Sequence, residues 1–406
     1  MVVRGRRWSR RRGGAVAFLL VLLAVQTMSS ASSRWVDGVR IPAGYRLVAR
    51  HHPGTGVWHL VLRRSHPGEV LNVGVLKRTS PNALRVILSN GRVAGPAPRT
   101  ERTSSMCRRV DCLVAVNGDF FTDAGAPVGG VVDGGEPVRS PNPSRSQFVI
   151  GPTGKPRVGP LQMAITLTST YSGVPTGLFK RTPTSQTKTT PIDGLNVIRG
   201  SDDIVVYTPR YGPTTETKKG TELIAKIVSP AGPLHTGVDT TVQLISQRTG
   251  GSSIPADGVV LSGQGDGAAT LAALWRDVRT GVATAQATLR VNADPAAVES
   301  VGGKPVLVRD GKRVTSSRSI RAPRTMIGWT ASGDVLMVTA DGRGNAAGLT
   351  VVEAADLMRA LGAVYALNLD GGGSTTFVLG GRVVNHPANS GYRERGVAVS
   401  VAIVPK

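Results

Sequence analysis

The feature that most constrains the fold is the regular interruption of short apolar runs by glycine, proline and asparagine. Between residues 45 and 100 the runs read YRLVAR, WHLVLRR, EVLNVGVLK and LRVILSN. Runs of this length between turn residues predict β-strands. Glycine and proline number 51 and 26 in 406 residues, which favours a turn-rich protein over a helix bundle. We therefore expect an α+β fold of mixed β-sheets with a few covering helices.

Turn signals predict several hairpins. We expect tight turns at Gly151–Gly154, Asp310–Gly311 and Ser332–Gly333, and a strand-turn-strand unit in GGVVDGGEPVR, because glycine adopts the backbone angles that tight turns need. Further strands are expected in MAITLT, DIVVYTP, ELIAKIV and TVQLIS. The polar segment KRTPTSQTKTTP between these runs predicts an exposed loop instead.

Two segments have helical spacing. The first is Ala268–Val278. The second begins after Thr350, which forms a capping-box pattern with Glu353. It ends before Gly362, a residue suited to a helix C-cap. Its apolar residues recur at helical spacing, which predicts a helix that packs on the core rather than a binding surface.

The first residues predict export. Six arginines and no acidic residue precede the eleven-residue apolar run AVAFLLVLLAV, and small residues follow it. This pattern is typical of a secretory signal over residues 1–31, and the run is shorter than the roughly 20 residues of a membrane span. An uncleaved anchor is the alternative. We expect residues 32–44 to form an N-terminal segment and residues 45–404 one domain, in a secreted or cell-wall-associated protein.

The charge is strongly basic, with 49 Lys and Arg against 26 Asp and Glu. Outside the cytoplasm this favours anionic partners such as a phosphate-containing wall glycan or an anionic lipid. A basic surface that only keeps the protein in solution is the alternative. Because no dense basic helix carries interleaved aromatic residues, we expect no nucleic-acid partner. The sequence predicts no oligomeric state.

Cys107 and Cys112 are the two cysteines of the chain. In an exported protein such a close pair predicts one disulfide. A metal site would need further soft ligands nearby. The loop leads directly into LVAVNGDFF, so the disulfide is expected to brace that segment.

The stretch NLDGGGST, residues 368–375, is the first candidate site. Consecutive glycine amides can converge on an anion, so Gly371, Gly372 and Gly373 are candidate phosphate donors, with Ser374 and Thr375 beside them. Asp370 is a candidate base or nucleophile. A wide turn closed by the aspartate side chain is the alternative. No GK[ST] follows, so the stretch is not a Walker loop.

Two other groups of residues are candidates. In VNGDFF, Asn117 and Asp119 are expected to face a polyol with a phenylalanine as a stacking wall, or else to form an ordinary turn. Arg324, Arg343 and Arg395 are candidate phosphate ligands, because guanidinium groups bind phosphate through two parallel hydrogen bonds. Asp341 precedes a turn glycine. Singly, each of these charges is more often a solvated surface group.

Other chemistries have little support. Gly263-x-Gly265-x-x-Ala268 matches the dinucleotide fingerprint loosely, but its surroundings are rich in β-strand, so a strand-turn-helix corner is expected. Neither HExxH nor GxSxG is present, which leaves zinc hydrolysis and serine-hydrolase chemistry without a motif. The sequence requires no cofactor or metal. A divalent cation is compatible with it, but no motif indicates one.

Together these motifs resemble the phosphodiester glycosidase family. The resemblance rests on RTMIGWTASGDVLMVTADGR and GLTVVEAADLMRALGAVYALNLDGGGSTTFVLGGRVVNHP, with LVAVNGDFF, GGVVDGGEPV, IVVYTPRYG, GVVLSG and GGKPVLVRDGK upstream in the same order. It extends over residues 45–404 and implies a phosphodiester-glycosidase-like domain. It also implies an exported hydrolase that breaks the bond between the anomeric carbon and the phosphate oxygen of a sugar 1-phosphodiester.

The resemblance also implies which residues line the site: Asn117, Gly118, Arg324, Thr325, Asp341, Gly342 and residues Asn368 to Thr375. Several relatives have a second glycine where this chain has Asp119, so Asp370 is the preferred catalytic residue, with Asp341 as its rival. Arg324, Arg395 and the Gly371–Gly373 amides are expected to bind the phosphate. Two functions compete with this one: a non-catalytic module that binds phosphorylated wall polymer, and a phosphodiesterase that cuts the P–O bond.

Overall fold

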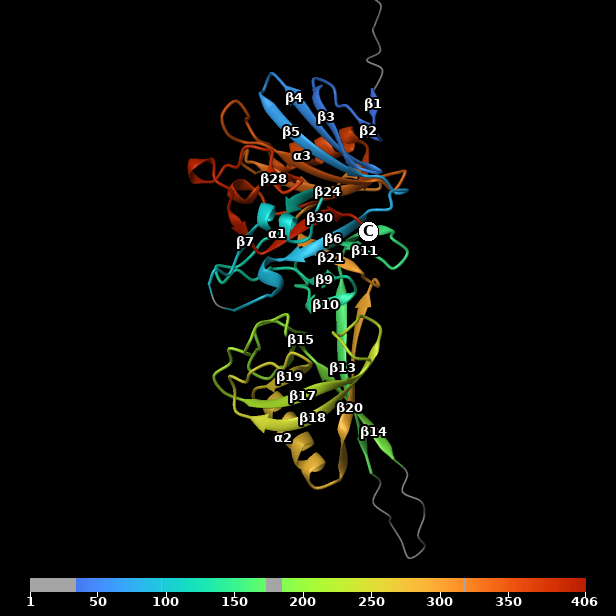
Figure 1. Ribbon diagram of the computed structural model, residues 1–406, viewed down its shortest axis with the longest axis vertical. Helices are drawn as coiled ribbons and strands as arrows, with labels where there is room; N and C mark the ends of the chain where they lie inside the picture. Colours follow the sequence, from blue (N-terminus) through green and yellow to red (C-terminus); the bar gives the residue numbers. More distant parts are fainter. Residues whose placement is uncertain (1–33, 96, 173–184, 317–318) are drawn as a thin grey trace, which may run out of the picture. The chain divides into compact units, whose positions relative to one another are not determined.

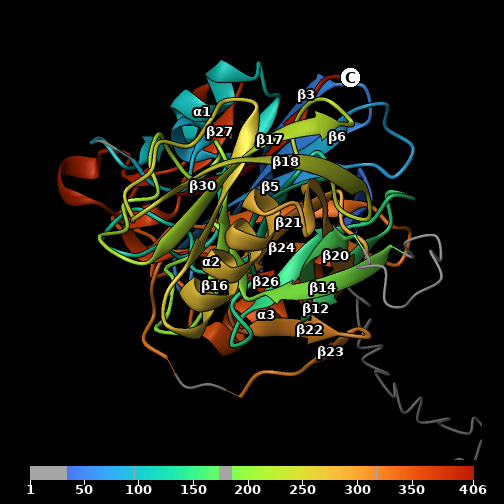
Figure 2. The same ribbon diagram turned by 90° about the horizontal axis from the view of Figure 1, so that it is seen from below.

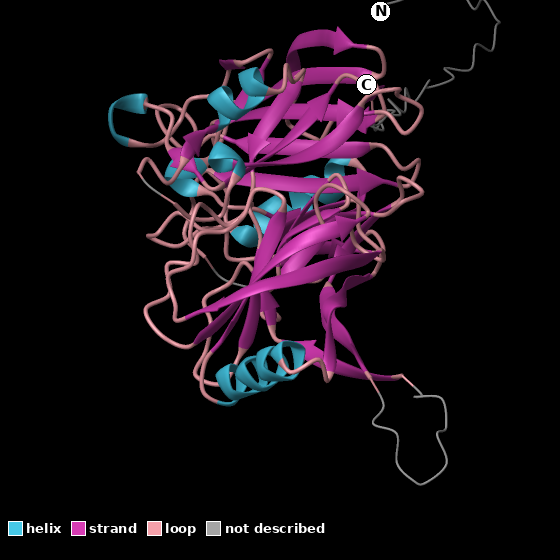
Figure 3. Cartoon of the chain, turned by 60° about the horizontal axis from the view of Figure 1, so that its bottom comes forward, coloured by secondary structure: helices cyan, strands magenta, loops and turns pink. Residues whose placement is uncertain are grey.

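The computed structural model describes residues 34–95, 97–172, 185–316 and 319–406. The predicted signal over residues 1–31 lies outside this part of the chain. Most of the regular structure in the described residues is β-strand (Figure 3). The prediction of an α+β fold is therefore corrected to a mainly β fold. Almost all strand pairs are antiparallel. Among the named strands of the described chain, the one parallel pair is β15 (Gly194–Leu195) with β16 (Ile204–Tyr207).

The first sheet joins distant parts of the chain. Its three N-terminal strands lie beside strands from the C-terminal quarter, so a blue group of ribbons adjoins an orange group in Figure 1. The strand order is β23 (Lys312–Arg313), β22 (Val306–Arg309), β26 (Ala363–Asn368), β24 (Arg324–Thr330), β25 (Val335–Ala340), β5 (Glu69–Leu76), β4 (Val57–Arg64) and β3 (Arg46–Gly54). The predicted hairpins at Asp310–Gly311 and Ser332–Gly333 are confirmed within it.

The second sheet also combines early and late strands. Its order is β28 (Arg382–Val383), β27 (Phe377–Leu379), β8 (Val114–Asn117), β30 (Val399–Val404) and β6 (Ala83–Leu88). Nearby, β29 (Gly396–Val397) pairs with β7 (Glu101–Arg102). Phe377 and Val114 of this sheet belong to one buried cluster with Met337 and Ile327 of the first sheet. The two sheets therefore share a core.

Helix α3 (Val351–Leu361) covers the other face of the first sheet. Thr350 and Glu353 form the predicted capping box, and Gly362 ends the helix in the left-handed conformation. The hairpin of β1 (Trp35–Val36) and β2 (Val39–Arg40) packs on the same cluster, where Val39 is fully buried. The folded part of the chain thus begins before residue 45.

The third sheet has the order β10 (Glu136–Arg139), β9 (Val131–Asp133), β21 (Glu299–Gly303), β11 (Ser146–Ile150) and β12 (Pro156–Gly159). The predicted strand-turn-strand unit is the hairpin of β9 and β10, and the predicted turn at Gly151–Gly154 joins β11 to β12. Phe148 and Val301 carry this sheet into the core shared by the first two sheets.

The fourth sheet is inserted between β12 and β21. Its order is β14 (Gln186–Ile192), β13 (Gln162–Tyr171), β20 (Ala283–Asp294), β18 (Asp239–Arg248), β17 (Thr221–Ser229), β19 (Gly258–Gly263), β16 (Ile204–Tyr207) and β15 (Gly194–Leu195). Part of the predicted loop KRTPTSQTKTTP lies outside the described residues, and its remainder forms edge strand β14, which corrects that prediction. Helix α2 (Asp266–Arg279) packs on this sheet (Figure 2), at the predicted strand-turn-helix corner.

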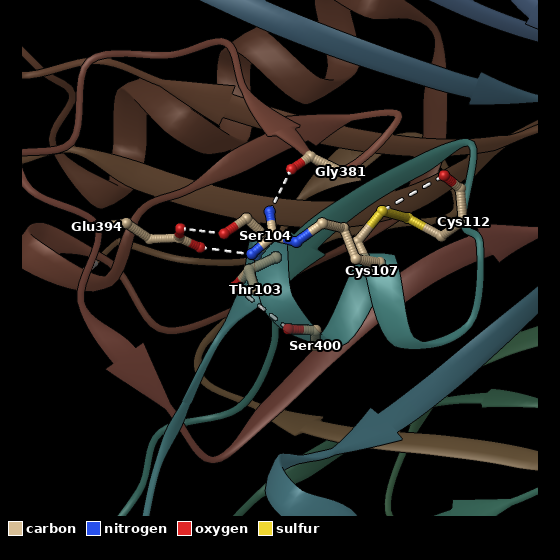
Figure 4. The surroundings of a disulfide bond; sticks show 8 residues. Thr103, Ser104, Cys107, Cys112, Gly381, Glu394 and Ser400 are labelled. Atoms are coloured by element: carbon tan, nitrogen blue, oxygen red, sulfur yellow. Dashed lines mark hydrogen bonds between the residues drawn. A yellow bond between two sulfur atoms is a disulfide. The ribbon is translucent and has the colours of Figure 1, made fainter.

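Helix α1 (Thr103–Arg109) was not expected from the sequence. It carries Cys107, which forms the predicted disulfide with Cys112 (Figure 4). In the described part of the chain, no helix has both the length and the apolar character needed to cross a membrane.

Candidate active site

The two principal sequence motifs meet where β8 and β26 end. Asn117 is the last residue of β8, and Asn368 is the last residue of β26. The Asp370 amide donates to the Gly118 carbonyl (3.0 Å), and the Asn117 side-chain amide donates to the Asp370 carbonyl (2.7 Å). NGDFF and LDGGGST, about 250 residues apart in the chain, therefore form one site.

Asn117 joins three segments at this point. Its Oδ1 accepts hydrogen bonds from Thr325 Oγ1 (2.7 Å) and from the Thr376 amide (3.0 Å). Asn117, Thr325 and Thr376 are all buried. Oδ1 and Nδ2 of Asn117 already have protein partners, so the structure supports a structural position for Asn117, and its contact with a polyol stays a prediction. The residue holds the Asp370 backbone in place.

The glycine loop does not form the expected three-amide anion site. The Gly371 amide donates to Asp370 Oδ1 (3.0 Å), and the Gly372 amide donates to the Pro323 carbonyl (2.9 Å). Gly372 has φ 59°, an angle that glycine adopts without strain. The short helix η2 (Gly372–Ser374) follows. The loop is thus a turn closed by the aspartate side chain, and it orients Asp370.

Asp370 is partly exposed at the rim of this loop. Burial raises its pKa, whereas the hydrogen bond from Ser374 and the positive charges of Arg395 and Arg145 lower it. Arg395 Nη1 also lies 3.4 Å from Ser374 Oγ. Two guanidinium groups therefore act on the same accessible carboxyl group.

The two arginines lie over two consecutive aromatic rings. The Arg145 guanidinium carbon is 4.8 Å from the centre of the Phe120 ring, and that of Arg395 is 4.9 Å from the centre of the Phe121 ring. Such contacts hold a guanidinium group in position while leaving its N–H edges available. Arg145 was not predicted, because it follows the loop SPNPS, which has no recognisable pattern.

Asp119 is completely buried beside Asp370. Its Oδ2 accepts the Gly129 amide (2.5 Å), and Oδ1 has no hydrogen-bond partner among the described residues. Burial raises the pKa of Asp119 to about 6, and the negative charge of Asp370 adds to the rise. Because Asp119 is inaccessible and Asp370 is partly exposed, Asp370 is better placed to reach a substrate.

Asp341 has a different environment. Its carboxylate oxygens accept weak hydrogen bonds from Asn385 Nδ2 (3.3 Å) and the His386 amide (3.4 Å). Burial raises its pKa, and both neighbours oppose that rise. Asn385 also donates to the Thr375 carbonyl (3.1 Å). Asp341 therefore supports the glycine loop from a neighbouring position, away from the aromatic–arginine pairs.

Arg324 and Arg343 do not join the arginines around Asp370. Arg324 Nε donates to the Leu349 carbonyl (2.9 Å), and its Nη2 donates to Ser319 and Ile320. Successive side chains of a strand point to opposite faces, so Thr325 reaches Asn117 while Arg324 points towards the start of α3. Arg343 is exposed in the turn after β25. Two nitrogens of the Arg324 guanidinium therefore already have protein partners, and contact of Arg324 with a phosphate stays a prediction.

Asn368 and Thr375 line the loop from inside. Asn368 Nδ2 donates to the carbonyls of Lys304 (2.9 Å) and Leu369 (2.8 Å). Asn368 Oδ1 and Thr375 Oγ1 are buried without a hydrogen-bond partner in the described chain. Unpartnered buried polar atoms are rare in proteins, so their presence beside Asp370 is consistent with a site for a polar ligand.

Helix α1 connects the disulfide to the Arg395 segment (Figure 4). The Glu394 carboxylate accepts the Ser104 amide (2.8 Å) and the Ser104 hydroxyl (2.5 Å). Arg108 donates to the carbonyl of Gly381, in the turn after β27 (2.7 Å). Helix α1, which carries Cys107 of the disulfide, thus binds both the turn after β27 and the residue before Arg395.

The described residues contain no group of three or more histidine, cysteine or acidic side chains that could hold a metal ion.

Comparison with known proteins identifies a related family. Residues 234–404 match the phosphodiester glycosidase family. The match includes the glycine loop, Asp341 and Arg395, so the resemblance is confirmed over that range. The upstream motifs with Asn117 and Asp119 lie outside it.

Curated relatives match over a short segment. The chain is 38% identical over 71 residues to N-acetylglucosamine-1-phosphodiester alpha-N-acetylglucosaminidase of Mus musculus, and 37% identical over 71 residues to that of Homo sapiens. Each match spans 18% of this chain and 14% of the relative.

Solved structures share the fold over most of the chain. A hypothetical protein from Synechocystis has a TM-score of 0.62 at 21% identity, covering 90% of this chain and 69% of the other. A protein from Burkholderia pseudomallei K96243, named as a candidate for export, has a TM-score of 0.60 at 24% identity, covering 83% and 74%. At these identities the similarity concerns the fold.

Proposed function

We propose that this protein is a glycosidase that hydrolyses a sugar 1-phosphodiester at the bond between the anomeric carbon and the phosphate oxygen. The observation that carries the proposal is the partly exposed Asp370 under the influence of Arg145 and Arg395, in a segment that matches the phosphodiester glycosidase family. A carboxylate suits the sugar side of such a bond, and two guanidinium groups suit the phosphate side.

The leaving group explains why one reactive carboxylate suffices. Ordinary glycosidases use a second carboxylic acid to protonate a poor leaving group. A phosphomonoester leaves without that proton, because its oxygens already stabilise the electron pair of the broken bond. The growing charge then needs cations, and we assign Arg145 and Arg395 this role.

We assign Asp370 the role of base or nucleophile. As a base it takes a proton from water, the water oxygen bonds to the anomeric carbon, and the C–O electron pair goes to the phosphate. As a nucleophile its own oxygen bonds to that carbon first, and water then hydrolyses the ester. Both routes yield the free sugar and a phosphomonoester.

The location and substrate class complete the proposal. We propose an exported protein that acts on a phosphate-containing surface glycan or glycolipid, which agrees with the basic composition. We further propose a signal over residues 1–31 and a folded domain that includes the β1–β2 hairpin, since Val39 packs on the α3 core.

Hydrolysis in oxygen-18 water tests the reaction. With the methyl diester of N-acetylglucosamine 1-phosphate, we expect the label in the sugar. Label in the phosphate would instead identify a phosphodiesterase, and binding without turnover would identify a binding module. Asp370→Asn should reduce turnover by at least about a thousandfold while leaving the unfolding midpoint unchanged. Near-normal turnover of this variant would contradict the assignment of Asp370.

A further inference from the structure

A cavity of about 720 Å³ lies where the first, second and third sheets come together, and no role has yet been assigned to it. Its walls include the segment between β5 and β6, the turn between β11 and β12, and the starts of β21 and β25. Binding sites for small molecules commonly have volumes of about 300–1,000 Å³. The cavity therefore has room for a ligand and not only for a few water molecules.

The walls of this cavity are basic. Lys77, Arg78 and Arg85 line it, and among the described lining residues Glu299 is the one acidic residue. Glu299 is buried, and its two carboxyl oxygens accept backbone amides at 2.8 and 2.9 Å. Burial raises the pKa of Glu299 to about 8, so this group carries little negative charge near neutral pH. The basic cavity, defined by Lys77, Arg78 and Arg85, therefore favours an anion.

Two of these cations are held by acidic residues that do not line the cavity. Lys77 Nζ lies 2.5 Å from Asp334 Oδ2, and Arg85 Nη2 lies 2.5 Å from Asp133 Oδ1. The Lys77 and Arg85 side chains nevertheless keep 30% and 42% of their surface exposed. Each cation can therefore contact a ligand through the N–H groups that its aspartate leaves unused.

Arg78 is exposed, and its guanidinium group forms no ion pair within the described part of the chain. The Arg78 backbone amide donates to Asp334 Oδ1 (2.9 Å). Its side chain passes over Gly333, where an added β-carbon would lie 2.8 Å from Arg78 Cδ. These contacts fix the beginning of the side chain and leave the charged end available. A guanidinium group of this kind binds phosphate through two parallel hydrogen bonds.

The basic cavity is separate from the site around Asp370. Val335, which lines the cavity, begins β25, whereas Asp341, which supports the glycine loop, follows the last residue of that strand. At about 3.3 Å per residue, the strand separates the two positions by about 20 Å. A single sugar 1-phosphodiester is too short to contact both places, whereas a polymer of such units can do so.

We propose that the basic cavity is a second binding site, which holds phosphate groups of a polyanionic glycan at a distance from the bond that is cleaved. The inference rests on the proposed function for the identity of this polymer as the substrate of Asp370. Attachment at a second place raises the effective concentration of the remaining bonds near Asp370. The cavity therefore favours long substrates over short ones.

Binding of a phosphodiester polymer without sugar tests the basic cavity. A hexamer of glycerol phosphate carries the charged groups but has no anomeric carbon for Asp370 to attack. We expect calorimetry at low ionic strength to show binding to the wild-type protein and a loss of about 10-fold in Arg78→Ala. Arg78→Lys keeps the charge and should recover part of the affinity. Absence of binding to the wild-type protein, or unchanged affinity in Arg78→Ala, would overturn the inference.

A matched control separates the cavity from the general charge of the protein. Arg279 is exposed on α2 and does not line the cavity, so Arg279→Ala removes the same charge and should leave the affinity unchanged. Because both arginines are exposed, both alanine variants should keep the wild-type unfolding midpoint. Equal losses of affinity in the two variants would indicate a general charge effect and overturn the inference.

A peptide ligand distinguishes phosphate from carboxylate. Hexa-aspartate should bind more weakly than the glycerol phosphate hexamer, because tetrahedral phosphate oxygens can be shared by cations from several directions and planar carboxylates cannot. Equal binding of hexa-aspartate that also depends on Arg78 would indicate an acidic protein partner and overturn the assignment of a phosphate polymer.

Hydrolysis separates this inference from the proposed function. With a polymer of N-acetylglucosamine units joined by 1-phosphodiester bonds, Arg78→Ala should raise KM by about 10-fold. KM for the methyl diester should not change, because this small substrate does not reach the cavity. If the hexamer binds through Arg78 but no diester is hydrolysed, the reaction is wrong and the anion site stands. If the polymer is hydrolysed with label in the sugar and with an unchanged KM in Arg78→Ala, the inference is wrong and the reaction stands.

Discussion

Arg324 and Arg395 differ in what their guanidinium groups already bind. Arg324 donates to backbone carbonyls and a serine near the start of α3, and burial lowers its pKa. Arg395 is exposed, lies over the Phe121 ring and acts on Asp370. The first arginine is therefore part of the scaffold, and the second is available to a substrate.

Arg395→Ala should raise KM for a sugar 1-phosphodiester by about 10- to 100-fold, because a charged hydrogen-bond donor to the phosphate is lost. Arg324→Ala should instead lower the free energy of unfolding by about 1–3 kcal/mol and leave KM unchanged. Steady-state kinetics and urea denaturation of both variants measure these effects. A KM increase in Arg324→Ala that matches the increase in Arg395→Ala would contradict the distinction.

The sequence pattern placed two of the candidate residues on neighbouring segments but could not assign the direction of every side chain. Asp370 and Asn117 follow strands that the apolar runs identify, and their proximity is confirmed. The direction of Arg324 could not be predicted, because strand alternation sends Arg324 and Thr325 to opposite faces and no apolar pattern indicates which face the site occupies. Arg145 was missed because it stands just before β11, and its contact with the Phe120 ring leaves no local signal in the sequence.

Helix α1 is short, but it contacts two other segments of the chain. Its first turn binds Glu394, and its last turn binds the Gly381 carbonyl. A carboxylate at a helix N-terminus is stabilised by the unpaired amides there. Because Arg395 follows Glu394 directly, the position of α1 determines where Arg395 can lie.

Glu394→Ala should lower the free energy of unfolding by about 1–2 kcal/mol and raise KM, because Arg395 loses its neighbouring anchor. Glu394→Gln keeps an acceptor for the Ser104 amide and should recover most of the KM effect. Thermal unfolding and steady-state kinetics measure the two quantities. The exposed Glu216 offers a control, Glu216→Ala. Unchanged KM in Glu394→Ala would show that α1 does not position Arg395.

The elements that the sequence predicts correctly are those with a strong local signal. The turns around Gly151–Gly154, Asp310–Gly311 and Ser332–Gly333 and the cap at Thr350 are each encoded by a few adjacent residues, and all are confirmed. Helix α1, with the sequence TSSMCRR, has mostly weak helix formers and no apolar stripe. Strand β14 lies at a sheet edge and is polar on both faces, so its sequence lacks the alternation of a strand and predicts a loop.

For the whole molecule, three buried carboxyl groups link stability to pH. Burial raises the pKa of Glu69 and of Glu299 to about 8, and that of Asp119 to about 6. The folded state keeps these protons at pH values where the unfolded chain, with ordinary pKa values, has released them. Unfolding therefore releases protons, and rising pH favours the unfolded state across this interval.

We expect stability to fall from about pH 5 to pH 8, by about 1.4 kcal/mol per pH unit for each group that keeps its proton. Denaturation with urea over this range measures the slope. Glu69→Gln should reduce the slope of unfolding free energy against pH by the contribution of one titrating group, because glutamine does not titrate. The exposed Asp257→Asn serves as the control. Equal slopes in wild type and Glu69→Gln would contradict the buried-acid explanation.

The order of strands in the first two sheets also determines when these sheets can be completed during synthesis. Strand β30 lies between β6 and β8, and β25 lies beside β5, so neither sheet is complete until the C-terminal strands have been made. Long-range pairing of this kind is slow, and partly made chains expose unpaired strand edges. During synthesis the chain must stay open until residues 399–404 arrive. The site around Asp370 is therefore among the last parts of the molecule to form.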